Sequence, residues 1–329
     1  MNAYILRRLL LLVPTLLIVS LVAFLSVRFI PGNVVDIMLA QAAGSSSVTQ
    51  ESRQALVHAM GLDVPLPIQY GRWLGVLPQE DGQFRGVLEG SLGTSLWNSQ
   101  SVTLLLVQRL PVSLELTLIA LVTAVLVSIP LGIYSAVRQD TPADYAGRSL
   151  SILFVSVPAF WVATMIIVYP AIWWHWSPSL TYIPITNDPG GNVLQFLLPG
   201  FLLGMLLGGT LMRITRTMML EVLRQDYVRT AWAKGLSEPR IVTRHALKNA
   251  LIPVVTVIGI VLPIVIGGTV VIEQIFDLPG IGLLLYQALS SRDYPLIAGI
   301  NLFLAVIVVV SNLVVDVSYA WLDPRIQYQ

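Results

Sequence analysis

Few residues in this sequence have the type and position for chemistry, and most of those are acidic. Glu115 and Asp316 lie inside long apolar runs, where an ionisable side chain is costly and often lines a pathway. Glu273, Asp277 and Asp293 follow another apolar run, and their carboxylates could face an amine or a delivery protein. The alternative for Glu115 and Asp316 is a structural pair or a place at the headgroup level. For the other three it is an ordinary solvated loop.

The sequence lacks the patterns of the common catalytic and metal sites. It contains no cysteine, which excludes a thiol nucleophile, a disulfide framework and a zinc-thiolate site. The three histidines, His58, His175 and His245, are far apart in sequence, so a histidine metal centre is not expected. No Gly-Lys pair occurs, so there is no Walker A loop for ATP. A His-Glu-x-x-His pair is absent, and the apolar runs hold no glycine-flanked serine with a histidine at membrane depth. We expect a non-catalytic chain that binds no metal or cofactor.

A polar, basic stretch covers residues 221–253, between two apolar runs. Within it, Ala231, Ala233 and Gly235 are small enough to let the surface of another protein approach the backbone. Charged side chains stand around them at Arg229, Lys234 and Arg240. Small residues ringed by charge are typical of a docking loop.

The same stretch predicts two short helices. Asp226 is expected to cap a helix over residues 227–234, which Gly235 ends. Ser237 or Glu238, placed before a proline, should start the second helix. Such a basic helix-turn-helix is also compatible with DNA binding, but a membrane tether and a single short recognition helix argue against a nucleic-acid partner.

These residues must be positioned by membrane-spanning helices. The chain of 329 residues is 55% hydrophobic and only 11% charged, whereas soluble proteins are about a quarter charged. Apolar runs long enough to span a bilayer cover residues 9–27, 114–137, 149–174, 193–212, 250–272 and 296–321. Prolines inside these runs should kink or break the helices; they are Pro130, Pro158, Pro170, Pro199, Pro253 and Pro263. Gly200, Gly204 and Gly208 share one face and predict close packing, within the subunit or between subunits.

The loops between the runs indicate an orientation. With a cytoplasmic amino terminus, most of the 19 Lys and Arg residues fall in inner segments, as the positive-inside rule requires. The first run is longer than the apolar part of a signal peptide, so we expect it to be retained. We predict an anchoring helix over residues 1–30, an outer subdomain over 31–109, a five-helix core over 110–322 with a cytoplasmic loop at 213–249, and a cytoplasmic tail over 323–329.

The segment RTAWAKG, residues 229–235, resembles the E-A-A-x-x-x-G loop of ABC importer permeases, with Arg229 in place of the leading Glu. Residues 89–93, EGSLG, have Ser91 where the dipeptide, oligopeptide and nickel branch of that family often has an aspartate. Further segments similar to this branch are residues 4–9 (YILRRL), 30–32 (IPG), 61–63 (GLD), 69–70 (QY), 275–282 (IFDLPGIG), 292–295 (RDYP) and 323–325 (DPR). The likeness covers essentially the whole chain.

This resemblance implies an all-α polytopic protein of the prokaryotic inner membrane, with six transmembrane helices in the type I permease fold and both termini cytoplasmic. It implies a first-type permease for peptides or a related solute. The implied partners are a second permease, two cytoplasmic ATPase subunits that use ATP and Mg, and an extracytoplasmic solute-binding protein. A secondary transporter, or a sensor or scaffold with the permease fold, is the alternative.

In that family the ATPase docks on the cytoplasmic loop. Carried over to the matching positions, the resemblance implies that the coupling residues are Tyr227, Arg229, Thr230, Ala231, Ala233, Lys234 and Gly235. Bulky replacements at Ala231 or Gly235 are then expected to uncouple transport while leaving folding intact. Glu115, Glu273 and Asp277 are the candidates for the substrate pathway or outer gate.

Overall fold

A computed structural model describes residues 2–29, 35, 39, 50–59, 61–178 and 181–322 of the chain. The motifs expected at residues 30–32 and 323–325, the predicted tail over 323–329, and the side chain of Asp316 lie outside the described residues.

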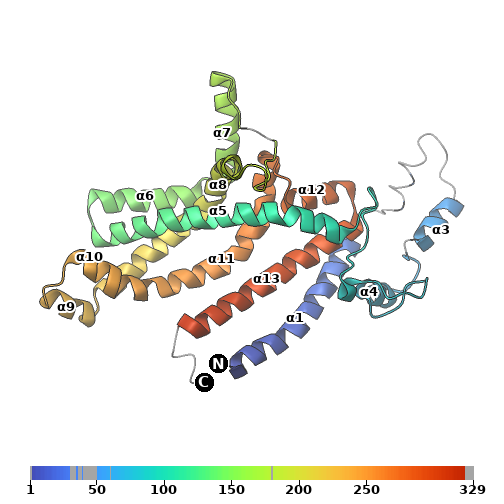
Figure 1. Cartoon of the computed structure of the whole chain (residues 1–329), viewed down its shortest axis with the longest axis horizontal. Helices are drawn as coiled ribbons and strands as arrows, with labels where there is room; N and C mark the ends of the chain where they lie inside the picture. The colour runs from blue at the N-terminus through green and yellow to red at the C-terminus, as the bar shows by residue number, and fades with distance from the viewer. Residues whose placement is uncertain are drawn as a thin grey trace. The chain divides into compact units, whose positions relative to one another are not determined.

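Most of the described residues are helical, and the β-structure among them is an isolated bridge between Thr94 and Ser101. Figure 1 labels the helices along the chain. In order they are α1 (Asn2–Arg28), α3 (Gln50–Ala59), α4 (Leu66–Leu74), η1 (Val87–Glu89), α5 (Val102–Val137), α6 (Pro142–Ser156), α7 (Ala159–Trp174), α8 (Pro189–Leu223), α9 (Asp226–Ala233), α10 (Glu238–Arg240), η2 (Ile241–Ala246), α11 (Leu247–Ile275), α12 (Ile281–Ser291) and α13 (Tyr294–Leu322).

Five of the described helices are long and apolar enough to cross a membrane, and a sixth span is counted when α6 and α7 are joined. The third predicted span, residues 149–174, is broken at Pro158, as expected for a proline inside it: α6 and α7 meet at an angle of 89°, and Figure 1 shows the steep departure of α7 from α6. The break follows from Pro158, which has no N–H and drives Val157 into an extended conformation with ψ 122°. By contrast, Pro130 and Pro199 remain inside α5 and α8.

The chain folds into two compact units. The first consists of Met1–Ile5, Pro111–Leu283 and Val310–Gln329. Its apolar core includes Leu116 of α5, Phe196 and Leu207 of α8, and Val254 of α11. These side chains are almost completely buried, so α5, α8 and α11 form the interior of this unit.

Three glycines explain how closely α8 approaches α5 inside this unit. A Cβ atom would lie 2.6 Å from Ile119 Cγ2 at Gly200, 2.5 Å from the Ala120 carbonyl oxygen at Gly204, and 2.8 Å from Ser128 Oγ at Gly208. The glycine face predicted from its four-residue spacing therefore packs against a helix of the same chain.

The second unit consists of Leu6–Leu110 and Leu284–Val309. Phe24 of α1 packs against Tyr70 and Trp73 of α4, with ring centroids 5.4 and 5.6 Å apart. Asp293 is 1% exposed and accepts hydrogen bonds from Ser95 Oγ (2.5 Å) and from the backbone N–H of Leu296 (3.3 Å). This carboxylate caps the first turn of α13 and is a structural group.

Candidate functional site

The predicted cytoplasmic loop folds as a helical hairpin, residues 226–246, which we call the coupling hairpin. Its first helix, α9, ends where Gly235 adopts a φ of +74°. The N–H of Gly235 bonds to the Trp232 carbonyl (2.9 Å) and the N–H of Leu236 to the Ala231 carbonyl (3.3 Å). This is the Schellman pattern of helix termination, so the predicted stop at Gly235 is confirmed.

The predicted cap of α9 is wrong. Gln225 is the N-cap residue, without a side-chain capping bond, and Asp226 is the first residue of the helix. At that position the carboxylate still interacts favourably with the positive end of the helix dipole. The second helix begins after Ser237, as predicted, and continues from α10 through the π-helical turn η2 directly into α11.

The interior of the coupling hairpin is a small apolar cluster. Val228, Ala231 and Ile241 are buried there, and Leu223 and Leu236 pack against them. Ala231 is only 5% exposed, so its small side chain permits α9 to lie close to the second helix. Ala231 was expected to offer a surface for docking, but its side chain is buried. We therefore expect a bulky replacement there to disturb the packing of the hairpin.

The outer face of α9 is exposed and carries two aromatic side chains. Tyr227 is 43% and Trp232 48% exposed, and Tyr227 Oη accepts a hydrogen bond from Asn249 Nδ2 at 2.8 Å. The other expected coupling residues on this face are also exposed: Arg229, Thr230, Ala233, Lys234 and Gly235. A Cβ added to Gly235 meets nothing within 4 Å, so the space outside this glycine is open. Trp232 was not among the coupling residues predicted from the sequence.

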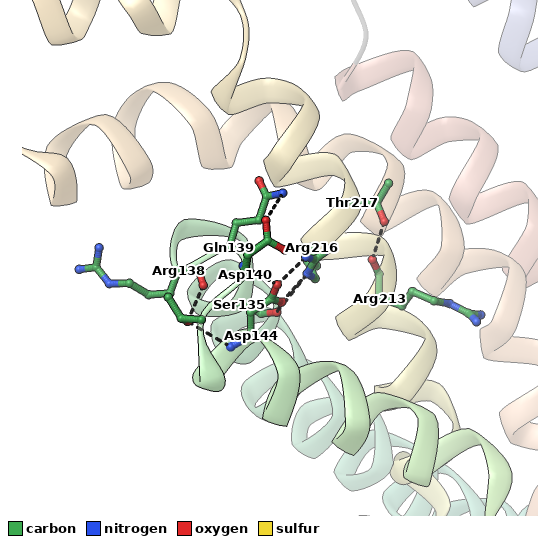
Figure 2. Close-up of polar contacts among 9 residues, drawn as sticks. Ser135, Arg138, Gln139, Asp140, Asp144, Arg213, Arg216 and Thr217 are labelled. Atoms are coloured by element: carbon green, nitrogen blue, oxygen red, sulfur yellow. Dashed lines mark hydrogen bonds and ion pairs between the residues drawn. The ribbon is translucent and has the colours of Figure 1, made fainter.

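At the base of the coupling hairpin, the ends of three helices are joined by polar contacts (Figure 2). Arg216 of α8 reaches Asp144 of α6 through two hydrogen bonds of 2.7 Å, from Nε and Nη2. Ser135 of α5 donates its hydroxyl to the same carboxylate. With the predicted orientation, Asp144 and Arg216 are expected on the cytoplasmic side, but the sequence gives no signal that they meet.

The neighbouring contacts link this base to the hairpin. Arg138 Nη1 lies 3.1 Å from Glu238 Oε1, between the end of α5 and α10. Ala136, Met219 and Ala246 belong to one buried apolar cluster, which brings together α5, α8 and η2. The hairpin is thus attached to the helices through packing as well as through the chain itself.

Glu115 lies between α5 and α8. Its Oε2 accepts a hydrogen bond from Asn192 Nδ2 at 3.3 Å, and the same amide donates to the Ile183 carbonyl at 2.8 Å. Glu115 Oε1 and Asn192 Oδ1 are buried without a hydrogen-bond partner among the described residues. Two buried acceptors of this kind are costly unless a donor reaches them.

Glu273 is completely buried near the end of α11. Its carboxylate accepts hydrogen bonds from Ser113 Oγ (2.7 Å) and the Leu283 N–H (2.8 Å), and Ser113 Oγ in turn accepts from the Ile281 N–H (2.8 Å). A Cβ at Gly280 would overlap the carboxylate. The expectation that Glu273 faces an outer mouth is corrected, because it holds the corner between α11 and α12. Asp277, by contrast, is exposed.

One group of ligand-type side chains lies in the second unit, apart from the expected sites. His58 Nδ1 is 2.6 Å from Asp63 Oδ2, and His58 Nε2 is 3.8 Å from Glu80 Oε2. All three side chains are exposed, and Arg72 Nη1 lies 3.2 Å from Glu80. The hydrogen bond to Asp63 raises the pKa of His58 above its usual value. The arrangement is that of an exposed ion-pair network.

Comparison with known proteins assigns the fold described above. The model of the family described as "Binding-protein-dependent transport system inner membrane component" matches residues 128–328, and the model of the corresponding N-terminal region matches residues 1–117. The chain belongs to this family. It is therefore an all-α, multi-pass permease subunit of a binding-protein-dependent transport system, as the sequence motifs predicted.

Relatives of this permease match along their whole length. A chain from Brucella abortus (strain 2308) is 39% identical over 328 residues, which cover 100% of both chains. The oligopeptide transport system permease protein AppB of Bacillus subtilis (strain 168) is 36% identical over 331 residues, again covering all of both. The dipeptide transport system permease protein DppB of Alkalihalophilus pseudofirmus is 35% identical over 348 residues, with complete coverage.

Proposed function

We propose that this permease imports peptides, as half of a pathway completed by a second, similar permease in the inner membrane. Two cytoplasmic ATPase subunits supply the energy from ATP and Mg, and an extracytoplasmic binding protein delivers the cargo. Peptide transport is supported by the names of full-length relatives. The distribution of Lys and Arg supports a cytoplasmic position for both termini.

The proposed contact with the ATPase rests on the exposed side chains of the outer face of α9. A short cytoplasmic helix that exposes Tyr227 and Trp232 between small residues has the composition of an interface centre, where aromatic anchors supply most of the binding energy. Arg229 and Lys234 are exposed at its edge, where charge favours encounter and orientation more than affinity. We infer that the ATPase binds this face.

The connection of α9 to its neighbouring helices explains how ATPase binding moves the permease in the proposed cycle. When ATP closes the ATPase pair, a force on α9 is transmitted to α8 and α11, which flank the coupling hairpin in the chain. A rigid displacement of these helices would change the side from which the pathway is open. Glu115 and Asp277 remain the proposed pathway residues of this chain, and Glu273 is left out of that set because it is buried.

The test is a matched pair of tryptophan truncations in the assembled transporter. Trp232→Ala removes the exposed anchor of α9 and should lower both the recovery of ATPase subunits with the purified permease and peptide-stimulated ATP hydrolysis. Trp174→Ala makes the same change at another exposed tryptophan, at the end of α7, and should leave both unchanged. Equal behaviour of the two variants would refute docking on α9.

Secondary transport and a sensor role predict a different outcome. A secondary transporter moves peptide in vesicles that contain no ATPase subunit. A sensor changes ATP turnover without moving peptide. Uptake that requires the ATPase subunits and ATP supports the importer.

A further inference from the structure

The contact between Asp144 and Arg216 is a buried ion pair with complete hydrogen bonding on the carboxylate. The Asp144 side chain is 0% exposed and that of Arg216 19%. Oδ1 accepts from Ser135 Oγ and Arg216 Nε, while Oδ2 accepts from Arg216 Nη2 and from the Asp140 N–H at 3.1 Å. We call Ser135, Asp144 and Arg216 the clamp.

The two hydrogen bonds from Arg216 to Asp144 fix the relative orientation of the guanidinium and the carboxylate as well as the distance between them. Two parallel bonds between a guanidinium and a carboxylate hold both groups in one plane, which a single bond or a lysine ammonium cannot do. Because each partner is largely desolvated, the pair is screened little by salt and resists separation. In Figure 2 the Arg213 side chain, on the same helix, points away from the carboxylate.

The helices around the clamp pack closely against one another. A Cβ at Gly132 of α5 would lie 2.8 Å from the Met212 carbonyl oxygen of α8. A Cβ at Gly147 of α6 would lie 3.0 Å from Met212 Cε. Thus α5, α6 and α8 approach one another closely where the clamp joins them, and close packing of this kind transmits displacement.

The clamp also stands between two moving parts of the proposed cycle. Arg216 precedes the end of α8 by about two helical turns, and α9 follows directly after α8. On the other side, Asp144 lies in the first turn of α6, which leads to the 89° break before α7. If a displacement of α8 were passed only to α11, α6 and α7 would not move with it.

We propose that the clamp is the transmission element that makes α6 move with α8 when the ATPase acts on α9. Arg216 is a positioning residue that fixes the angle between α8 and α6, and the break at Val157–Pro158 is the joint at which α7 takes up the movement. This inference rests on the proposed docking of the ATPase on α9. It adds a residue pair and a helix that the docking motif does not include.

The first experiment uses the complete transporter in proteoliposomes and compares Arg216→Lys with Arg213→Lys. Arg216→Lys keeps the positive charge beside Asp144, so the carboxylate stays paired, but it removes the two parallel hydrogen bonds, which we call the fork. Peptide moved per ATP hydrolysed should fall about tenfold, the factor expected for the loss of one charge-assisted bond of the fork. Subunit recovery and ATP hydrolysis should stay near those of the unaltered transporter, and Arg213→Lys should match it throughout.

A purely structural clamp gives a different pattern. Assembly, ATP hydrolysis and transport would then fall together in Arg216→Lys, with the ratio of peptide to ATP unchanged, and the proposal would be overturned. An unchanged ratio with normal assembly would overturn it as well.

The second experiment follows the movement itself and does not depend on transport. Because the chain has no cysteine, spin labels can be attached at cysteines introduced for the exposed residues Ala146 of α6 and Thr217 of α8. In the otherwise unaltered chain the distance between the labels should be the same with and without ATP. In Arg216→Lys the distribution of label distances should be broader, or its mean should differ between the states with and without ATP. A distance that changes with ATP while the clamp is intact would contradict transmission.

Failure of the clamp can be told apart from failure of the docking proposal. If the ATPase does not bind α9, Trp232→Ala leaves subunit recovery and ATP hydrolysis unchanged. If docking is correct and the clamp is not the transmission element, Trp232→Ala impairs both while Arg216→Lys keeps a normal ratio of peptide to ATP.

Discussion

Replacing Glu273 by glutamine should destabilise this permease, because the buried carboxylate accepts from two donors, Ser113 Oγ and the Leu283 N–H. A glutamine side chain has one oxygen and one NH2 group, so one of the two donors would face another donor. A buried donor left without a partner costs about 1–3 kcal/mol. At about 2 °C for each kcal/mol in a protein of this size, Tm should fall by about 2–6 °C.

The matched control is Asp277→Asn, the same chemical change four positions later on an exposed side chain at a φ of +50°. Asparagine tolerates positive φ, so Tm should shift by less than about 1 °C, as expected for a surface position. Tm is measured on purified protein in detergent from intrinsic tryptophan fluorescence. An unchanged Tm for Glu273→Gln, together with a raised KM for peptide, would refute the corner role and return Glu273 to the pathway.

Three further predictions follow from the described contacts. Ala231→Leu should overpack the interior of the coupling hairpin by about 1–3 kcal/mol, seen as a lower Tm and faster proteolysis within residues 226–246; an unchanged Tm would place Ala231 outside that interior. Glu115→Gln should keep or raise Tm, because its NH2 group can donate to the buried Asn192 Oδ1, and should reduce peptide uptake if the charge of Glu115 serves the pathway; a lower Tm with normal uptake would contradict both. The pKa of His58 should lie above the usual histidine value and return toward it in Asp63→Asn, as NMR titration of the imidazole protons can measure. The stability that this pair contributes is complete below the pKa of histidine in the unfolded chain and is lost as the pH rises through the pKa of His58 in the folded protein.

The parts of the fold that depend on local composition were predictable from the sequence. Long apolar runs located α1, α5, α8, α11 and α13, because a bilayer-spanning helix must satisfy its backbone internally and present apolar side chains. The end of α9 at Gly235 was also predictable from local sequence, since glycine adopts a positive φ at little cost. The family motif then located the coupling hairpin.

The parts that depend on which residues meet in space were not predictable. Pro158 breaks a span whereas Pro130 and Pro199 stay within helices, and neighbouring elements decide between these outcomes. Asp144 and Arg216 are 72 positions apart, so their charges could be assigned to a side of the membrane but not to each other. The sequence placed Glu273 in an outer loop from its neighbours, whereas tertiary contacts bury it.

The central claim is that an ATPase subunit binds the outer face of α9, and site-specific cross-linking in the native membrane tests it most directly. A photo-crosslinking residue at Lys234, exposed beside Gly235, should yield a covalent product whose second chain is identified by mass spectrometry as an ABC ATPase subunit. The same residue at Trp174, exposed at the end of α7, should yield no such product. Absence of the ATPase from the Lys234 product, or its equal presence in both, would contradict the account.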